Sequence, residues 1–238
     1  MYVSRETLIK ECGEIGIELS EKQLSDFEKF AEMVVETNKH LNLTAITDPE
    51  GIAVKHFTDS LTLLTAIDIP EGAKLLDVGT GGGFPAVPIM IARRDIDMTM
   101  VDSTAKRLKF VDSAVEALSL KGITVHSRAE ELGKNKAYRE KFDFVTARAV
   151  ANLRDLSEYC LPFVKQGGFF IAMKGPLASE EIKDAQNAIK ILGGEIKEIK
   201  NIILSDAGER NMVMIKKISQ TPPKYPRPSA QIAKRPLV

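Results

Sequence analysis

Residues 74–85 read KLLDVGTGGGFP, and this stretch decides the fold. A short apolar run, Leu75, Leu76 and Val78, ends in a turn that is dense in glycine, and an apolar segment of helical length follows at residues 86–92. This order predicts a buried strand, a tight loop and then a helix. Such a unit opens nucleotide-type cofactor sites in open α/β sheets.

The glycine loop also discriminates between cofactors. Gly79 and Gly81 let the backbone turn sharply and approach a ligand where a Cβ would collide. A dinucleotide fingerprint would need a third glycine where Phe84 stands, and the Gly-Lys-Ser/Thr of a P-loop does not follow. Asp77 predicts an acidic rim, which would repel a pyrophosphate but suit the cationic amino group of a methionine moiety. The loop therefore favours S-adenosylmethionine over NAD or ATP.

Length and composition indicate an ordinary globular chain. The 238 residues suffice for one α/β domain with an accessory element, and 44% hydrophobic with 28% charged residues is typical of such proteins. No apolar run reaches membrane-spanning length and no signal segment is evident, so we expect a cytoplasmic protein, with a monomer as the default state. Cys12 and Cys160 form no CxxC pair, and the scattered His40, His56 and His126 predict no metal site.

The segment before the glycine loop reads as helical. Apolar residues at helical spacing follow the potential N-caps Ser4 and Ser20, and Pro49 opens a third helical pattern. Pro70-Glu71-Gly72 then marks a boundary. We expect three regions: an N-terminal helical extension packed on the core at 1–70, a core domain at 71–218, and a basic, proline-rich, loosely structured tail at 219–238.

Beyond residue 74, strand and helix patterns alternate along the chain. This alternation predicts an α/β fold with a doubly wound, mostly parallel sheet covered by helices on both faces. The last two strands, joined by a hairpin loop at 205–210, add an antiparallel end and bring the sheet to seven strands. The expected strands are 74–78, 97–101, 122–126, 142–146, 168–173, 198–204 and 211–216, and the expected helices are 85–93, 105–118, 129–137, 151–164 and 178–192.

Polar residues follow the predicted strands where an open sheet binds its ligand, beyond the carboxyl ends. Asp102 comes about twenty residues after the glycine loop, at the spacing of an acid that accepts from two ribose hydroxyls. Ala129 and Glu130 follow the third strand and are suited to an adenine edge, and Arg148 ends the fourth. Together with the loop, they predict an adenosyl-cofactor site.

Each of these residues has a purely structural alternative. Asp102 could simply cap the helix that begins near Thr104. Glu130 could complement a helix dipole, and Arg148 could brace the sheet end through a carboxylate. The recurrence of loop and acids within one βαβ unit favours the cofactor site.

The strand-end motifs resemble the small-subunit ribosomal RNA methyltransferase G family, also called glucose-inhibited division protein B. The resemblance spans about residues 20–216 and runs in order along the chain. It rests on residues 42–44 (NLT), 56–61 (HFTDSL), 77–85 (DVGTGGGFP), 102–103 (DS), 106–107 (KR), 127–130 (SRAE), 147–149 (ARA) and 173–175 (MKG).

The resemblance implies a Rossmann-like class I methyltransferase fold and an activity. The implied enzyme uses S-adenosylmethionine to methylate N7 of guanine 527 in the 530 loop of 16S ribosomal RNA, either as RNA or within a 30S assembly intermediate. It also implies that Gly79, Phe84, Ala129, Glu130 and Arg148 contact the cofactor. The tail departs from the family pattern, because residues 228–231 (PSAQ) stand where a lysine and a glycine are expected.

Guanine N7 has an in-plane lone pair and no proton to lose, so methyl transfer needs alignment and exclusion of water but no obligatory base. No catalytic residue is therefore assigned. Methylation at pyrimidine C5 would need a cysteine nucleophile, and Cys160 lies in a helical apolar pattern away from the strand ends. Methylation of an exocyclic amine usually shows Asn/Asp-Pro-Pro-aromatic, where residues 146–149 read TARA.

Contacts to RNA are expected from basic side chains. His56 and Asp59, three residues apart on one helix face, could seat the base or only bond along the helix surface. Methylation of another RNA, a protein or a small molecule stays open, as does a non-catalytic RNA-binding module that retains a cofactor pocket. The candidate phosphate-binding residues are Arg93, Arg94, Lys106, Arg107, Lys174, Lys224 and Arg227.

Overall fold

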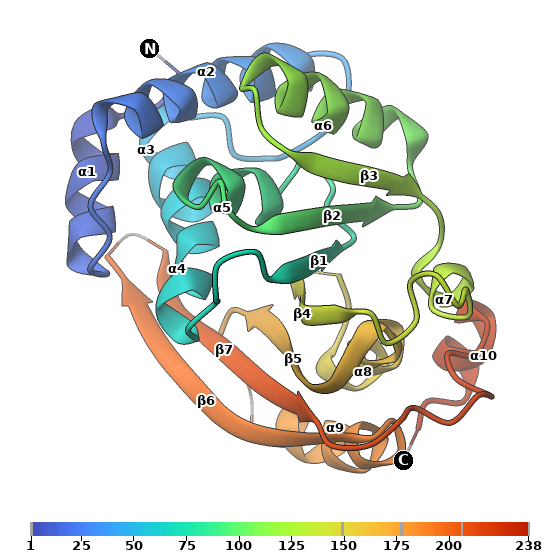
Figure 1. The fold of residues 1–238 in the computed structure, drawn as a ribbon. Helices are drawn as coiled ribbons and strands as arrows, with labels where there is room; N and C mark the ends of the chain where they lie inside the picture. The colour runs from blue at the N-terminus through green and yellow to red at the C-terminus, as the bar shows by residue number, and fades with distance from the viewer. Residues whose placement is uncertain (1, 149, 177–178, 206, 238) are drawn as a thin grey trace.

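A seven-stranded sheet forms the centre of the molecule, with strand order β3-β2-β1-β4-β5-β7-β6 (Figure 1). The computed structural model describes residues 2–148, 150–176, 179–205 and 207–237. Strands β1 to β5 are parallel, and β7 runs antiparallel to both β5 and β6. The predicted sheet is thus confirmed. The strands are β1 (Lys74–Val78), β2 (Asp97–Asp102), β3 (Gly122–His126), β4 (Phe142–Arg148), β5 (Val164–Lys174), β6 (Gly194–Leu204) and β7 (Gly208–Lys217).

The last two strands are longer than predicted, because their pairing continues almost to the turn, from Gly194–Lys217 to Leu204–Gly208. Asp206, in the predicted hairpin loop, lies outside the described residues.

Helices cover both faces of the sheet. Two helices are shorter than predicted: Gly133 follows the end of α7, and Pro162 in the 3-10 turn η2 (Leu161–Phe163) ends α8, because proline cannot continue a helix. Position 178, the predicted start of the last core helix, is not described. The helices are α5 (Ala86–Ala92), α6 (Ala105–Ala117), α7 (Ala129–Leu132), α8 (Leu153–Cys160) and α9 (Ser179–Ile191).

The N-terminal segment forms the predicted helices. Ser4 caps the first, and Ser20 caps the second in a capping box with Gln23. The third predicted helix is continuous, but its hydrogen-bonding pattern changes from α-helical to π-helical in the middle and back again. Within the described ranges, no helix is both long and apolar enough to cross a membrane. The elements are α1 (Arg5–Glu14), α2 (Glu21–Asn38), α3 (Pro49–Gly51), η1 (Ile52–Thr58) and α4 (Asp59–Ala66).

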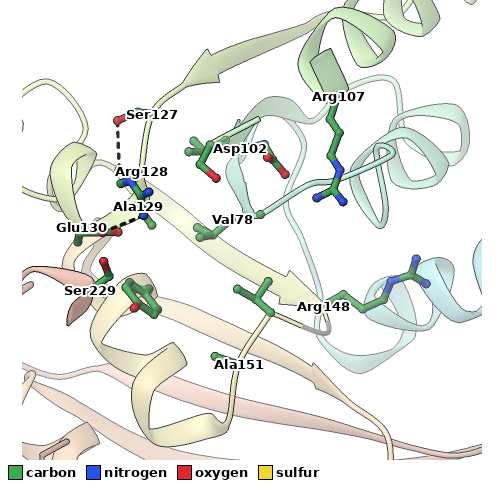
Figure 2. A pocket seen from close by; sticks show the side chains of 15 residues that line it. Val78, Asp102, Arg107, Ser127, Arg128, Ala129, Glu130, Arg148, Ala151 and Ser229 are labelled. Carbon is green, nitrogen blue, oxygen red and sulfur yellow. Dashed lines mark hydrogen bonds and ion pairs between the residues drawn. The ribbon is translucent and has the colours of Figure 1, made fainter. Parts of the chain in front are cut away.

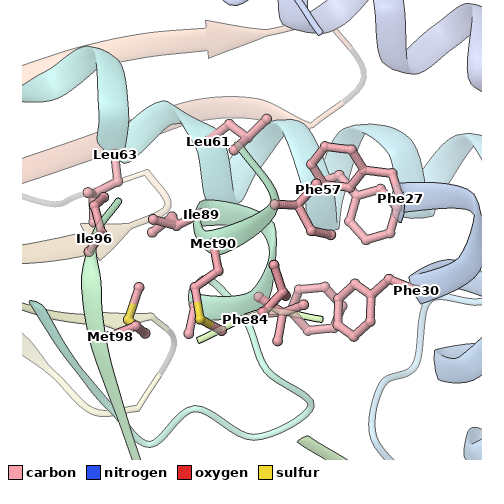
Figure 3. Packing of buried hydrophobic residues seen from close by; sticks show 14 of the residues in the cluster. Phe27, Phe30, Phe57, Leu61, Leu63, Phe84, Ile89, Met90, Ile96 and Met98 are labelled. Carbon is pink, nitrogen blue, oxygen red and sulfur yellow. The ribbon is translucent and has the colours of Figure 1, made fainter. Parts of the chain in front are cut away.

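An aromatic cluster joins these N-terminal helices to the glycine loop (Figure 3). Phe27 and Phe57 lie 4.8 Å apart between ring centroids, and Phe30 lies 5.4 Å from Phe84. All four rings are buried, and burying an aromatic side chain contributes about 1.5–3 kcal/mol of apolar stabilisation. The extension is therefore part of the same core as the sheet.

The C-terminal tail is docked, so the expectation of a loosely structured tail was wrong. It forms the helix α10 (Ser229–Lys234), which packs against α8. Arg139 donates to the carbonyl oxygens of Thr221 and Tyr225 at 2.6 and 2.8 Å. Arg227 forms two hydrogen bonds to the carboxylate of Glu158, at 2.8 and 2.6 Å. These long-range contacts have no local sequence signal, because each partner lies far away along the chain.

Replacing Arg227 with alanine should destabilise the protein by about 2 kcal/mol, because it leaves the 1%-exposed Glu158 carboxylate without its cation. Urea denaturation measures this loss. Lys224→Ala, an exposed charge in the same tail, should change stability by less than about 0.5 kcal/mol. Adding Glu158→Gln to Arg227→Ala should recover part of the loss. Equal stability of Arg227→Ala and the parent would contradict the ion pair's role.

Candidate cofactor site

A cavity of about 480 Å³ opens at the carboxyl ends of β1, β2 and β4, where the strand order reverses (Figure 2). Its volume suits a small-molecule ligand, and the switch point is where open α/β sheets bind one. Its walls come from four strand ends, α8 and the tail. The lining residues are Val78, Gly79, Val101, Asp102, Ser103, Arg107, Ser127, Arg128, Ala129, Glu130, Arg148, Val150, Ala151, Tyr159 and Ser229.

The glycine loop is fastened to the end of β2. The backbone N–H groups of Gly79 and Thr80 donate to the carbonyl of Val101 at 2.8 and 3.0 Å. Gly79 has φ +76°, a left-handed conformation that favours glycine, and a Cβ placed there would lie 2.9 Å from Cγ2 of Val150. The loop conformation is thus specific to glycine at this position.

Asp102 fastens two neighbouring segments at the end of β2. Its Oδ2 accepts from the N–H of Gly81 at 2.9 Å, and its Oδ1 accepts from the N–H of Thr104 at 2.7 Å. The carboxylate therefore anchors the loop and the start of α6, as the structural alternative predicted. It also lines the cavity, and each oxygen can accept a second hydrogen bond. Binding of ribose hydroxyls stays a prediction that this geometry permits.

Ala129 and Glu130 line the cavity at the start of α7, as predicted for residues near an adenine edge. Tyr159 from α8 and Ser229 from α10 line it as well, and the sequence did not indicate either. Burial, followed by the charge of Glu130, raises the pKa of Tyr159, so its hydroxyl stays protonated at neutral pH. No sequence motif could place Ser229 here, because its position depends on docking of the tail.

Arg148 connects the cavity to the N-terminal extension. Its Nη1 lies 2.7 Å from Oδ2 of Asp59, and its guanidinium stands 5.3 Å from the ring centroid of Phe84. The structural alternative for Arg148, an ion pair with a carboxylate that braces the sheet end, is thus present, and Asp59 of α4 supplies the carboxylate. Arg148 also lines the cavity, and its contact with a cofactor stays a prediction.

The predicted acidic rim was wrong. Asp77 does not line the cavity: it is fully buried on the other side of β1, and neither carboxylate oxygen has a hydrogen-bond partner among the described residues. Side chains alternate along the strand, so Leu76 and Val78 face α8 while Asp77 faces the opposite layer. Burial raises the pKa of Asp77 to about 7. The cavity's charges come instead from two acids and three arginines: Asp102, Glu130, Arg107, Arg128 and Arg148.

Phe84 also lies outside the cavity lining. It is 7% exposed within the aromatic cluster, and its ring stacks on His56 at 4.5 Å between centroids. Its contact with a cofactor, which the family resemblance implied, has no support in this placement. Gly81 does not line the cavity either, and it acts through its N–H bond to Asp102.

Two of the candidate phosphate-binding residues lie away from the cavity. Arg93 and Arg94 lie in the turn between α5 and β2, at the amino ends of the strands and thus across the sheet from the cavity. Arg93 is paired with Asp95, and Arg94 with the buried Asp26. A phosphate would have to compete with these carboxylates, and phosphate binding by Arg93 and Arg94 stays a prediction.

The other candidate cations are divided among several surfaces. Arg107 lines the cofactor cavity, whereas Lys106 lies in a separate groove between α2 and α6. Lys224 stacks on Tyr225 at 5.2 Å from the ring centroid, and Arg227 is committed to Glu158. Lys174 pairs with Glu181. Phosphate binding by Arg227 would require it to leave Glu158, and for Arg227, Lys106, Arg107, Lys174 and Lys224 it stays a prediction.

The cysteines are core residues. Both are fully buried, and burial raises the pKa of Cys12 to about 11 and that of Cys160 well above its ordinary value. Neither is therefore a ready nucleophile. Within the described ranges, His, Cys, Asp and Glu nowhere gather in a group of three that could hold a metal ion.

Arg148 also lines a second cavity, of about 400 Å³. This second cavity lies between the helical segment 52–66 and the ends of β4, β5 and β7. Its other polar residues are Lys55, His56, Asp59, Lys174 and Arg210.

A family model described as rRNA small subunit methyltransferase G matches residues 23–213. The chain belongs to this family. The methyltransferase G relatives include a "Ribosomal RNA small subunit methyltransferase G" of Desulforamulus reducens, 46% identical over 97% of both chains. A protein of the same name from Lactobacillus johnsonii is 48% identical, over 98% of this chain and 99% of its own length.

Solved structures show the fold of this methyltransferase G family member to be that of class I methyltransferases. An S-adenosylmethionine-dependent O-methyltransferase from Thermotoga maritima superimposes with a TM-score of 0.53 at 14% identity, covering 79% of this chain and 72% of that one. At this identity, the likeness concerns the fold alone.

Proposed function

We propose that this chain is an S-adenosylmethionine-dependent methyltransferase that modifies N7 of a guanine in the 530 loop of 16S ribosomal RNA, at guanine 527 by the family resemblance. The observation that carries the proposal is the cavity at the switch point, whose glycine loop is tied to Asp102, in a chain that belongs to the rRNA small subunit methyltransferase G family. The substrate class comes from the relatives' names.

The residues of the cavity fit an adenosyl amino acid. Asp102 would accept from the ribose hydroxyls, and Ala129 with Glu130 would contact the adenine. The amino-acid end carries both an ammonium and a carboxylate, and the cavity offers charges of both signs, including Arg148 for the carboxylate. When bound, the cofactor supplies an electrophilic methyl group on a sulfonium.

The protein's task would be alignment. Guanine N7 has a lone pair and no proton, so no side chain must act as a base. This agrees with the absence of a cysteine nucleophile: both cysteines are buried in the core. The chain would hold the acceptor in line with the methyl group and exclude water, which is what a cavity covered by the residue 150–151 loop and the tail can provide.

Labelled methyl transfer tests the proposal. The purified protein is incubated with S-adenosylmethionine and small-subunit RNA from cells that lack the protein, offered as free RNA and as 30S particles. N7-methylguanine weakens the glycosidic bond, so chemical cleavage maps its position. We expect one new cleavage site, at guanine 527. Label at another nucleotide, or in protein, would contradict the proposed substrate, and cofactor binding without any transfer would indicate a non-catalytic RNA-binding module.

A further inference from the structure

We propose that the second cavity, which Arg148 also lines, receives the target guanine and that Asp59 recognises the Watson–Crick edge of this base. We call it the acceptor-side cavity. This inference rests on the proposed function and adds the residues that would recognise the substrate. The cavity shares Arg148 with the cofactor cavity, so a base held there would lie next to the methyl donor. Its volume of about 400 Å³ is within the range of small-molecule sites.

The charge of this cavity suits an RNA nucleotide. Four cationic side chains, Lys55, Arg148, Lys174 and Arg210, surround the single carboxylate of Asp59. Lys174 is also paired with Glu181 outside the lining, whereas Lys55 is exposed and forms no ion pair with a described residue. Lys55 is thus the cation best placed for an RNA phosphate.

Asp59 is held in a fixed orientation by two arginines. Its Oδ1 accepts from Nε of Arg210 at 2.6 Å, and its Oδ2 accepts from Nη1 of Arg148 at 2.7 Å. The residue is only 5% exposed, yet it lines the cavity. Each oxygen keeps a lone pair, because a carboxylate can accept about four hydrogen bonds. Two parallel acceptors match the N1–H and N2–H donors of guanine, whereas adenine presents an acceptor at N1.

This orientation is consistent with the chemistry at N7. The N7 atom lies on the edge of the purine opposite the N1–H and N2–H donors. A guanine that is hydrogen-bonded to Asp59 through these donors therefore keeps N7 accessible to the methyl group. His56 lines the same cavity, and its Nδ1 is buried without a partner among the described residues, while Nε2 lies 2.7 Å from Oγ1 of Thr44.

Three variants test the acceptor site. Asp59→Asn keeps the side-chain size but presents an amide N–H toward guanine's donors. It should lower kcat/KM for methylation of small-subunit RNA by about 100-fold. Its affinity for S-adenosylhomocysteine, measured by calorimetry, should fall far less than kcat/KM does, because Asp59 is connected to the cofactor cavity only through Arg148. Lys55→Ala should weaken RNA binding and reduce the slope of log K against log salt by about one. The exposed Lys190→Ala, on α9, is the matched charge-removal control and should change neither quantity.

An altered base separates recognition from a structural role of Asp59. Small-subunit RNA ligated to carry inosine at the acceptor position lacks the N2 amino group. The parent enzyme should lose about tenfold in kcat/KM when inosine replaces guanine. The Asp59→Asn variant should have the same kcat/KM on the two RNAs. Equal activity of the parent on guanine and inosine, or normal activity of folded Asp59→Asn, would overturn the acceptor site.

The inosine and Lys55→Ala measurements keep this test valid if Asp59→Asn does not fold. Failure of the parent to methylate guanine-containing RNA at all would instead overturn the proposed function, and the acceptor site with it.

Discussion

Replacing Gly79 with valine should weaken binding of S-adenosylhomocysteine at least about 100-fold, which corresponds to about 2.7 kcal/mol. Gly79 lines the cofactor cavity with φ +76°, and a Cβ there would lie 2.9 Å from Cγ2 of Val150. A branched side chain would therefore fill ligand space, push the covering loop and strain the backbone at once. Calorimetry on the folded variant measures the loss.

The matched control is Gly72→Val. Gly72 has nearly the same conformation, φ +72°, but no atom lies within 4 Å of its Cβ position and it is not among the cavity's lining residues. This variant should suffer a similar backbone strain, on the order of 1–2 kcal/mol of stability, and keep the parent's affinity. If Gly79→Val bound the ligand as tightly as Gly72→Val does, the loop would not be the cofactor site.

Replacing Asp77 with asparagine should abolish a loss of folding stability that the parent protein shows as the pH rises. The carboxyl is fully buried without a hydrogen-bond partner, and burial raises its pKa to about 7, against about 3.9 in an unfolded chain. Below about pH 4 both states hold the proton. As the pH rises from about 4 to about 7, the unfolded chain releases the proton first, so the native state loses stability. Above about pH 7 the loss is complete.

Urea denaturation of the ligand-free protein at several pH values measures this effect. Relative to the parent, Asp77→Asn should gain on the order of 3 kcal/mol of stability between pH 5 and pH 8. Comparing the two proteins at each pH cancels the titration of all other groups. A difference that does not change with pH would show that Asp77 titrates with the same pKa in the native and unfolded chains.

The periodic and local features of the fold could be predicted from the sequence. Every strand of the sheet was placed, because each is a short apolar run between turn signals. The caps at Ser4 and Ser20 were also recognisable, because a cap bonds within its own first turn. The cofactor-side positions of Gly79, Asp102, Ala129, Glu130 and Arg148 were found because they follow strand ends.

The errors concern which way side chains point and which distant segments meet. Asp77 was placed on the rim because its strand end was located correctly but its side of the sheet was not. Phe84 packs against rings of the N-terminal extension, and Ser229 reaches the cavity because the tail is docked through contacts such as the Arg227–Glu158 pair. The first contact joins residues 54 positions apart, Phe30 and Phe84, and the second joins residues 69 positions apart, where local patterns carry no information.

The most direct test of the cofactor site is a crystal structure with S-adenosylhomocysteine. We expect the ligand in the cavity at the ends of β1, β2 and β4, with its ribose hydroxyls on Asp102, its adenine beside Ala129 and Glu130, and its sulfur toward Arg148 and the acceptor-side cavity. A ligand bound anywhere else on the protein, or a cavity that stays empty at saturating ligand, would contradict the account.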